Sequence, residues 1–161
     1  MPVAGPPPAD PAGRLAEPGI CFVTWKREGR LRGCIGSVEP IRPLFQDVEA
    51  NAVSALVHDP RFPPATAKEF PRYRAEISVL SPFLPAADPT AIEIGVHGLL
   101  VERGRRRGLL LPQVAVEWKW DVETFLRQAC LKAGLPEESW REGSPPATVS
   151  IFTAEVFAEP A

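Results

Sequence analysis

The run LRGCIG at residues 31–36 places an arginine and a cysteine inside an apolar stretch of the kind that forms β-strands. Alternate side chains of an extended strand share a face, so Arg32 and Cys34 are expected on one face, with Leu31 and Ile35 on the other. A guanidinium close to a thiol favours the reactive thiolate form of the cysteine. The pattern predicts that Cys34 is a nucleophile and that Arg32 binds an anionic substrate.

The two glycines of this run admit two interpretations. Gly33 and Gly36 have no side chains and let a ligand approach the backbone closely, so both are candidates for substrate binding. Glycines within a strand also mark bulges or tight packing, and a free cysteine is often a small buried hydrophobe. A structural role for Cys34 therefore stays open, whereas Cys21 and Cys130, inside apolar patterns, are predicted to be structural.

The next segment, residues 43–57, is rich in helix formers and is followed by Asp59-Pro60, a helix stop. Its polar residues are spaced four, three and four apart and so form one stripe: Asp47, Asn51, Ser54 and His58. If the stripe faces Cys34, His58 is a candidate general base and Asn51 its orienting partner. The alternative is a solvated helix edge, with His58 favoured as a cation at the helix C-terminus.

Two loops carry further basic residues. In DPRFPP, residues 59–64, prolines fix the backbone around Arg61 and Phe62, so Arg61 is a candidate for binding an anionic group; a loop that only caps the fold has the same composition. The turn ERGRRRG holds four arginines, at 103, 105, 106 and 107. These supply only a few phosphate contacts, so a solvated turn is favoured over nucleic-acid binding.

Composition limits the classes of function. The chain has 161 residues, 45% of them apolar, and a net charge of −2, so it lacks the overall field that draws a protein onto nucleic acid or lipid. No apolar run is long enough to span a membrane. The three cysteines and two histidines follow no metal-binding or disulfide spacing, and neither a Walker nor a dinucleotide fingerprint is present. We expect a reduced, cytoplasmic protein without a metal or cofactor.

The order of predicted elements indicates an α+β fold with a mostly antiparallel sheet flanked by helices, because hairpins and helices alternate without a βαβ repeat. Residues 1–18 are a Pro-rich segment predicted to be a disordered leader, and 19–161 a single domain. The elements expected within the domain are a hairpin from Ile20 to Ile35, a helix over 43–57, a capped turn at 66–69, a strand over 73–79, a hairpin over 96–114, a helix over 122–133 and one long strand over 147–157.

Several segments, in order, resemble the AMMECR domain family: FVTW, GRLRGCIGSVEPIRPL, HDPRFPP, AEISVLSP, GVHGLLVE, RRRGLLLPQV and CLKAGLPEESW. The resemblance covers about residues 20–157, and LRGCIG is the family's signature. It implies two unequal lobes and a cleft bordered by the signature strand. It also implies Memo-like and radical SAM partners, as in AmmeMemoRadiSam systems. It supplies no agreed reaction. Members usually have a helical segment before FVT, where this chain has the Pro-rich leader.

Three hypotheses follow. The first is an enzyme or enzyme subunit acting on a small anionic molecule, with Cys34 as nucleophile or covalent carrier, His58 as base, and Arg32 and Arg61 as anion ligands. The second is a non-catalytic adaptor that binds Memo-like or radical SAM partners through DPRFPP and the signature strand. The third, ranked last, is nucleic-acid binding through the turn at 103–107.

Overall fold

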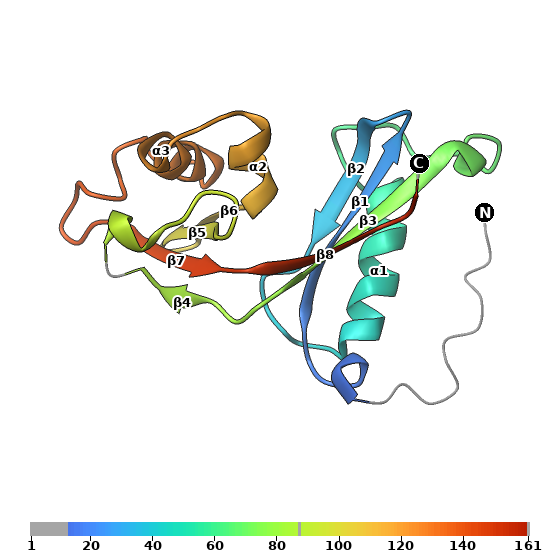
Figure 1. Ribbon diagram of the computed structural model, residues 1–161, viewed down its shortest axis with the longest axis horizontal. Helices are drawn as coiled ribbons and strands as arrows, with labels where there is room; N and C mark the ends of the chain where they lie inside the picture. The colour runs from blue at the N-terminus through green and yellow to red at the C-terminus, as the bar shows by residue number, and fades with distance from the viewer. Residues whose placement is uncertain (1–12, 87, 161) are drawn as a thin grey trace. The chain divides into compact units, whose positions relative to one another are not determined.

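The computed structural model describes residues 13–86 and 88–160, which form two compact units. The first unit holds residues 13–80 and 155–160, and the second holds residues 81–154. Each is built on a four-stranded sheet with antiparallel hairpins, together with helices, so the predicted α+β class is confirmed (Figure 1). The predicted single domain spans both units.

The first unit contains the predicted hairpin, helix and strand. Its elements are η1 (Gly13–Leu15), β1 (Ile20–Arg27), β2 (Arg30–Gly36), α1 (Leu44–Val57), η2 (Phe70–Arg72), β3 (Tyr73–Leu80) and β8 (Ala154–Ala158). The strands lie in the order β2-β1-β3-β8, so the signature strand β2 is at a sheet edge. Of the predicted leader, residues 1–12 lie outside the described residues, and residues 13–18 form η1 and a bridge between Pro18 and Pro43.

Helix α1 lies along one face of this sheet (Figure 1). Apolar side chains of β1, β3 and α1 fill the contact, with Cys21, Val23 and Leu44 at 0–5% exposure. The Trp25 indole also faces the helix and donates to the Ala52 carbonyl at 2.9 Å. Because side chains alternate along β1, Thr24 lies on the opposite face, and so does Cys34, its partner in β2.

The second unit packs helices on its own sheet. Its elements are β4 (Leu84–Pro85), η3 (Pro89–Ala91), β5 (Gly98–Arg103), β6 (Arg106–Leu110), α2 (Pro112–Glu117), α3 (Val122–Lys132) and β7 (Thr148–Phe152), with strand order β4-β7-β5-β6. The Asp121 side chain caps α3 by accepting from the Thr124 N–H, as its sequence predicts. Gly134, at φ +75°, follows the helix as the predicted stop.

Two predicted strands differ from the structure. The strand predicted over 109–114 ends at Leu110, because Pro112 lacks the N–H a ladder needs and suits the first turn of α2. The long strand predicted over 147–157 is two strands, β7 and β8, which belong to different sheets. Between them Thr153 exchanges hydrogen bonds with Ser81, at 2.8 and 2.9 Å, and the ladder of the second unit ends there.

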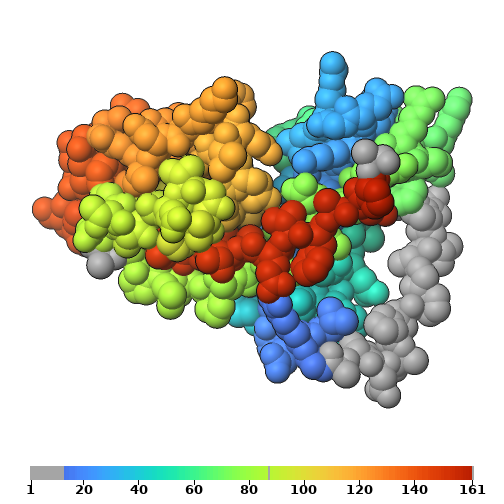
Figure 2. All heavy atoms as spheres, in the orientation of Figure 1, coloured from blue at the N-terminus to red at the C-terminus, as the bar shows by residue number. Residues whose placement is uncertain are grey.

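The C-terminal strand β8 is at the surface of the face shown in Figure 2. Its Val156 and Phe157 side chains are exposed. Among the described residues, no helix is long and apolar enough to cross a membrane.

Candidate functional site

The signature strand β2 contains a bulge at Arg32. Trp25 of β1 pairs with Gly33, whereas the next residue, Lys26, pairs with Leu31, so Arg32 is an extra residue on β2. A bulge redirects the side chain it carries and interrupts the alternation along the strand. The expected placement of Arg32 and Cys34 on one face relied on that alternation, and the sequence shows no sign of the bulge beyond the neighbouring glycine.

Arg32 instead contacts the loop after α1. Its Nη2 donates to the Pro63 carbonyl at 3.2 Å. Its guanidinium carbon lies 5.6 Å from the centre of the Phe62 ring and 5.8 Å from that of the buried Tyr73. The guanidinium carbon of Arg61 lies 5.5 Å from the same Phe62 ring. Both guanidinium groups therefore lie within cation–π distance of one aromatic ring, an arrangement stabilised by the ring quadrupole.

Cys34 is half-buried, and its side chain and backbone are both held by hydrogen bonds. The Thr24 hydroxyl donates to Sγ at 3.2 Å. The Cys34 N–H donates to Asp59 Oδ2 at 3.0 Å, and the Cys34 carbonyl accepts from Arg61 Nη2 at 3.5 Å. Both backbone groups point away from β1, at the open edge of the sheet, where a further strand would otherwise pair.

Asp59 and Arg61 supply the hydrogen bonds that a further strand would make with Cys34 at this edge. Asp59 is 4% exposed and accepts from Arg61 three times, from the backbone N–H at 3.1 Å, Nε at 3.0 Å and Nη2 at 2.7 Å. The Arg61 guanidinium holds the pKa of Asp59 well below its usual range, and Asp59 in turn raises the pKa of Arg61. From the sequence alone, Asp59 is predicted only as a helix stop. The sequence signal for this ion pair is the order Asp59-Pro60-Arg61, in which the proline turns the Arg61 side chain back toward the Asp59 carboxylate.

The two glycines of the signature are explained by packing. A Cβ on Gly33 would lie 1.9 Å from the Ala55 carbonyl oxygen of α1, so the glycine lets helix and strand approach closely. A Cβ on Gly36 would lie 2.2 Å from the Phe22 ring. The predicted substrate-binding roles of Gly33 and Gly36 remain predictions, since these contacts account for both residues without a ligand.

Asn51 lies beside Cys21 rather than Cys34. Its Nδ2 is 3.1 Å from the Cys21 carbonyl, 3.2 Å from Ser37 Oγ and 3.1 Å from Asp47 Oδ2. Helix α1 covers the sheet face opposite the one that carries the Cys34 side chain. The structure therefore does not bring Asn51 to the Cys34 thiol.

His58 is the residue that follows the last turn of α1. Its backbone N–H donates to the Ser54 carbonyl at 2.7 Å, and its side chain is exposed. It directly precedes Asp59, so it lies next in sequence to the residue that holds the Cys34 backbone. Its predicted role as a base stays a prediction.

The three cysteines are free thiols in different surroundings. Cys21 and Cys130 are 0% exposed, and burial raises the pKa of Cys21 to about 12 and also raises that of Cys130. Thiols in such surroundings are inert. Only Cys34 is partly accessible, in agreement with the prediction that the other two are structural.

The arginines of the β5–β6 turn bond within their own unit. Arg106 donates to the Gly134 carbonyl at 2.7 Å, Arg103 to the Glu142 carbonyl at 3.1 Å, and Arg107 pairs with Glu102 at 2.9 Å. Arg105 is exposed, and nucleic-acid binding through this turn stays a prediction. In the described part of the chain, no three His, Cys, Asp or Glu side chains gather as a metal would require.

Residues 3–157 match the model of the AMMECR1 family. The chain belongs to this family. It is 48% identical over 144 residues to a protein of Methanothermobacter thermautotrophicus, covering 86% of this chain and 74% of the relative. It is 45% identical over 163 residues to protein TK0174 of Thermococcus kodakarensis, covering 95% of this chain and 78% of that one. The resemblance found in the sequence is thus confirmed.

Among solved structures, this AMMECR1-family chain is similar to the uncharacterised protein PH0010 of Pyrococcus horikoshii. The TM-score is 0.90 at 43% identity, and the match covers 96% of this chain and 80% of that one. The α+β fold of this chain is therefore also seen in a crystal structure. No activity, substrate or partner comes with these relatives.

Proposed function

We propose that this AMMECR1-family chain is an enzyme or enzyme subunit that handles a small anionic molecule beside Cys34. The observation that carries the proposal is the fixed, partly accessible Cys34 next to Arg61, in a chain whose other two cysteines are fully buried. We further propose a cytoplasmic location and Memo-like and radical SAM partners, on the family resemblance alone.

Each residue of the site has a distinct part in this proposal. The Cys34 thiol is the nucleophile or covalent carrier, and the Thr24 hydroxyl orients its sulfur. Arg61 holds the anionic group of the substrate; its side chain is 53% exposed although Asp59 fixes it. Arg32, whose guanidinium also lies within cation–π distance of the Phe62 ring, supplies a second cation. His58 is the base.

Thiol alkylation tests the proposal directly. With neutral iodoacetamide at pH 7, peptide mapping should show Cys34 modified at least about tenfold faster than Cys21 and Cys130, because the buried thiols stay protonated and inaccessible. In urea all three should react alike. Protection of Cys34 until unfolding would contradict a reactive thiol.

The charge preference of the site can be measured with the same assay. Iodoacetate carries a carboxylate, so Arg61→Gln should slow its reaction with Cys34 more than it slows that of iodoacetamide. Arg30→Gln is the matched control, because Arg30 is an exposed arginine on the hairpin that carries Cys34. An equal effect of Arg61→Gln on both reagents would leave Arg61 without a role in binding anions.

A non-catalytic adaptor is the second candidate. It is favoured by the loop at 60–64, where Phe62 contacts both Arg32 and Arg61 and three prolines, Pro60, Pro63 and Pro64, are exposed. Such a surface loses little conformational entropy on binding a protein. Co-purification of a Memo-like or radical SAM protein that is lost with Arg61→Ala but kept with Cys34→Ser would favour the adaptor over the enzyme.

A further inference from the structure

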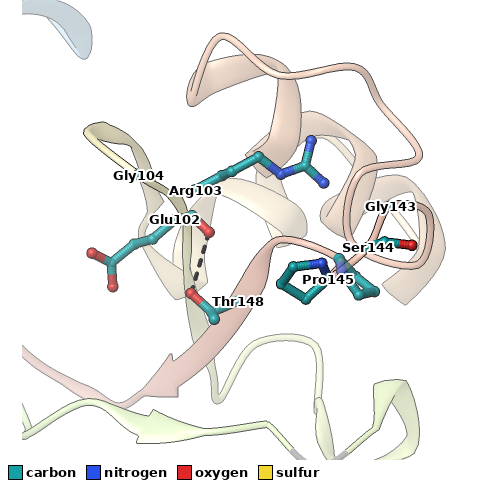
Figure 3. A pocket seen from close by; sticks show the side chains of 8 residues that line it. Glu102, Arg103, Gly104, Gly143, Ser144, Pro145 and Thr148 are labelled. Carbon is teal, nitrogen blue, oxygen red and sulfur yellow. Dashed lines mark hydrogen bonds between the residues drawn. The ribbon is translucent and has the colours of Figure 1, made fainter.

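The second unit contains a cavity of about 570 Å³ between the end of the β5–β6 hairpin and the loop that precedes β7 (Figure 3). Its size lies within the usual range for small-molecule sites, about 300–1,000 Å³. None of its residues belongs to the Cys34 site. The lining residues are Glu102, Arg103, Gly104, Gly143, Ser144, Pro145, Pro146 and Thr148.

Arg103 brings an unbalanced positive charge to this cavity. Its Nη2 donates to the Glu142 carbonyl at 3.1 Å, and among the described residues no carboxylate lies within ion-pair distance of it. Glu102, the one acidic residue of the lining, is already paired with Arg107 at 2.9 Å. Figure 3 shows the Glu102 carboxylate directed away from the loop that carries Gly143 and the Arg103 guanidinium directed toward that loop. The cavity is therefore electropositive on the Arg103 side.

Gly143 makes room for the guanidinium. Its φ is +124°, in the region that favours glycine, and a Cβ there would lie 2.7 Å from Arg103 Nη2 and 3.0 Å from the Pro145 carbonyl oxygen. The next residue, Ser144, carries a hydroxyl that can donate a hydrogen bond. The loop thus brings its backbone at Gly143 close to the Arg103 guanidinium, and Ser144 lines the same cavity.

We propose that this cavity binds a small molecule through a carboxylate or phosphate group. A guanidinium offers five N–H donors in a planar fork that matches such oxyanions, and one hydrogen bond to a carbonyl leaves most of them for a ligand. The Ser144 hydroxyl donates to a further ligand oxygen. This cavity is separate from the Cys34 site, and the proposed binding does not depend on the function proposed for Cys34.

Isothermal titration with inorganic phosphate and with citrate, at constant ionic strength, tests the site. Saturable binding with a Kd of about 1 mM or tighter is expected for at least one of the two probes. Arg103→Gln should weaken it by about 10- to 100-fold, because a hydrogen bond to a charged group is lost. Arg105→Gln, an exposed arginine at the same hairpin tip, should bind as the unmodified chain does.

The two probes separate the sources of the oxyanion, since preference for phosphate indicates a phosphorylated ligand and preference for citrate a carboxylate. Amide NMR shifts of the unmodified chain, confined to Gly104, Gly143 and Ser144, would place the ligand without relying on a variant. The absence of saturable binding by either probe would overturn the proposal, as would equal weakening by Arg103→Gln and Arg105→Gln. Unchanged binding in Cys34→Ser would show that the two sites are independent.

Discussion

Two aspartates bind the backbone of the signature hairpin, one on each of its strands. Asp47, within α1, accepts from the N–H of Cys21 in β1 at 2.9 Å, and Asp59, just after α1, accepts from the N–H of Cys34 in β2 at 3.0 Å. Each is also bonded to an arginine Nε, from Arg42 at 2.8 Å and from Arg61 at 3.0 Å. The chain thus uses the same pair of residue types twice, each time next to a cysteine.

The two sites differ in how completely they are enclosed. Asp47 is 0% exposed, and Ser37 and Asn51 complete its set of donors. Beside it the Cys21 thiol is fully buried. Asp59 fixes only the backbone of Cys34, whose side chain lies with Thr24 on the sheet face opposite α1 and is only half-buried. The same aspartate–arginine pair therefore lies in a fully buried structural contact beside Cys21 and holds the backbone of a half-buried cysteine at Cys34.

Asp47→Ala should cause the largest loss of stability. It removes a buried acceptor and leaves the Cys21 N–H, the Ser37 hydroxyl and the Arg42 guanidinium without their partner, so the free energy of unfolding should fall by about 3–5 kcal/mol. Urea denaturation measures this. Glu49→Ala, on the exposed side of the same helix, should change it by less than about 0.5 kcal/mol. Similar losses in both variants would remove the structural role of Asp47.

Asp59→Asn should lower the free energy of unfolding by a smaller amount, about 2–3 kcal/mol at pH 7, because the amide retains one acceptor while the ion pair with Arg61 is lost. Since the folded pKa of Asp59 is lowered, its stabilisation is complete above the unfolded value of about 3.9 and fades as the pH falls below it. The stability gap between the two proteins should thus narrow below about pH 4. A constant gap down to pH 2 would contradict the ion pair.

Arg61→Lys should lower stability by about 1 kcal/mol, because the side chain is half exposed and a lysine cannot bond both carboxylate oxygens as a fork. The informative readout is amide hydrogen exchange. The Cys34 N–H should exchange faster and the Cys21 N–H should not, since Asp47 holds the latter independently. Equal acceleration at both amides would mean that the two aspartate sites form one unit. Arg30→Lys serves as the control.

Thr24→Val should have the smallest effect. The volume is nearly conserved and only the hydrogen bond to Cys34 Sγ is removed, so stability should change by less than about 1 kcal/mol. The rate of Cys34 alkylation should change a few-fold, whereas Cys21 should stay protected. An unchanged rate at Cys34 would show that Thr24 does not orient the sulfur.

The local pattern was enough to predict most elements. The spacing of apolar residues and the Asp121 and Gly134 signals predicted α3 and its ends, and the hairpin over 20–35 followed from β-branched residues around a glycine turn. The split of the closing strand was not predictable in the same way. Its two halves have similar strand-forming residues, and only their pairing in different sheets separates β7 from β8.

By itself the sequence determined the α+β class and the family, and it marked Cys34 as a candidate, because residue types and their spacing along one strand or helix are local properties. The tertiary structure decided which groups surround that cysteine. The bulge at Arg32, the turn of Arg61 onto Asp59 and the position of Asn51 across the sheet depend on which segments pack together. Strand alternation and helix periodicity give each residue's face, and only the packed fold shows what that face meets.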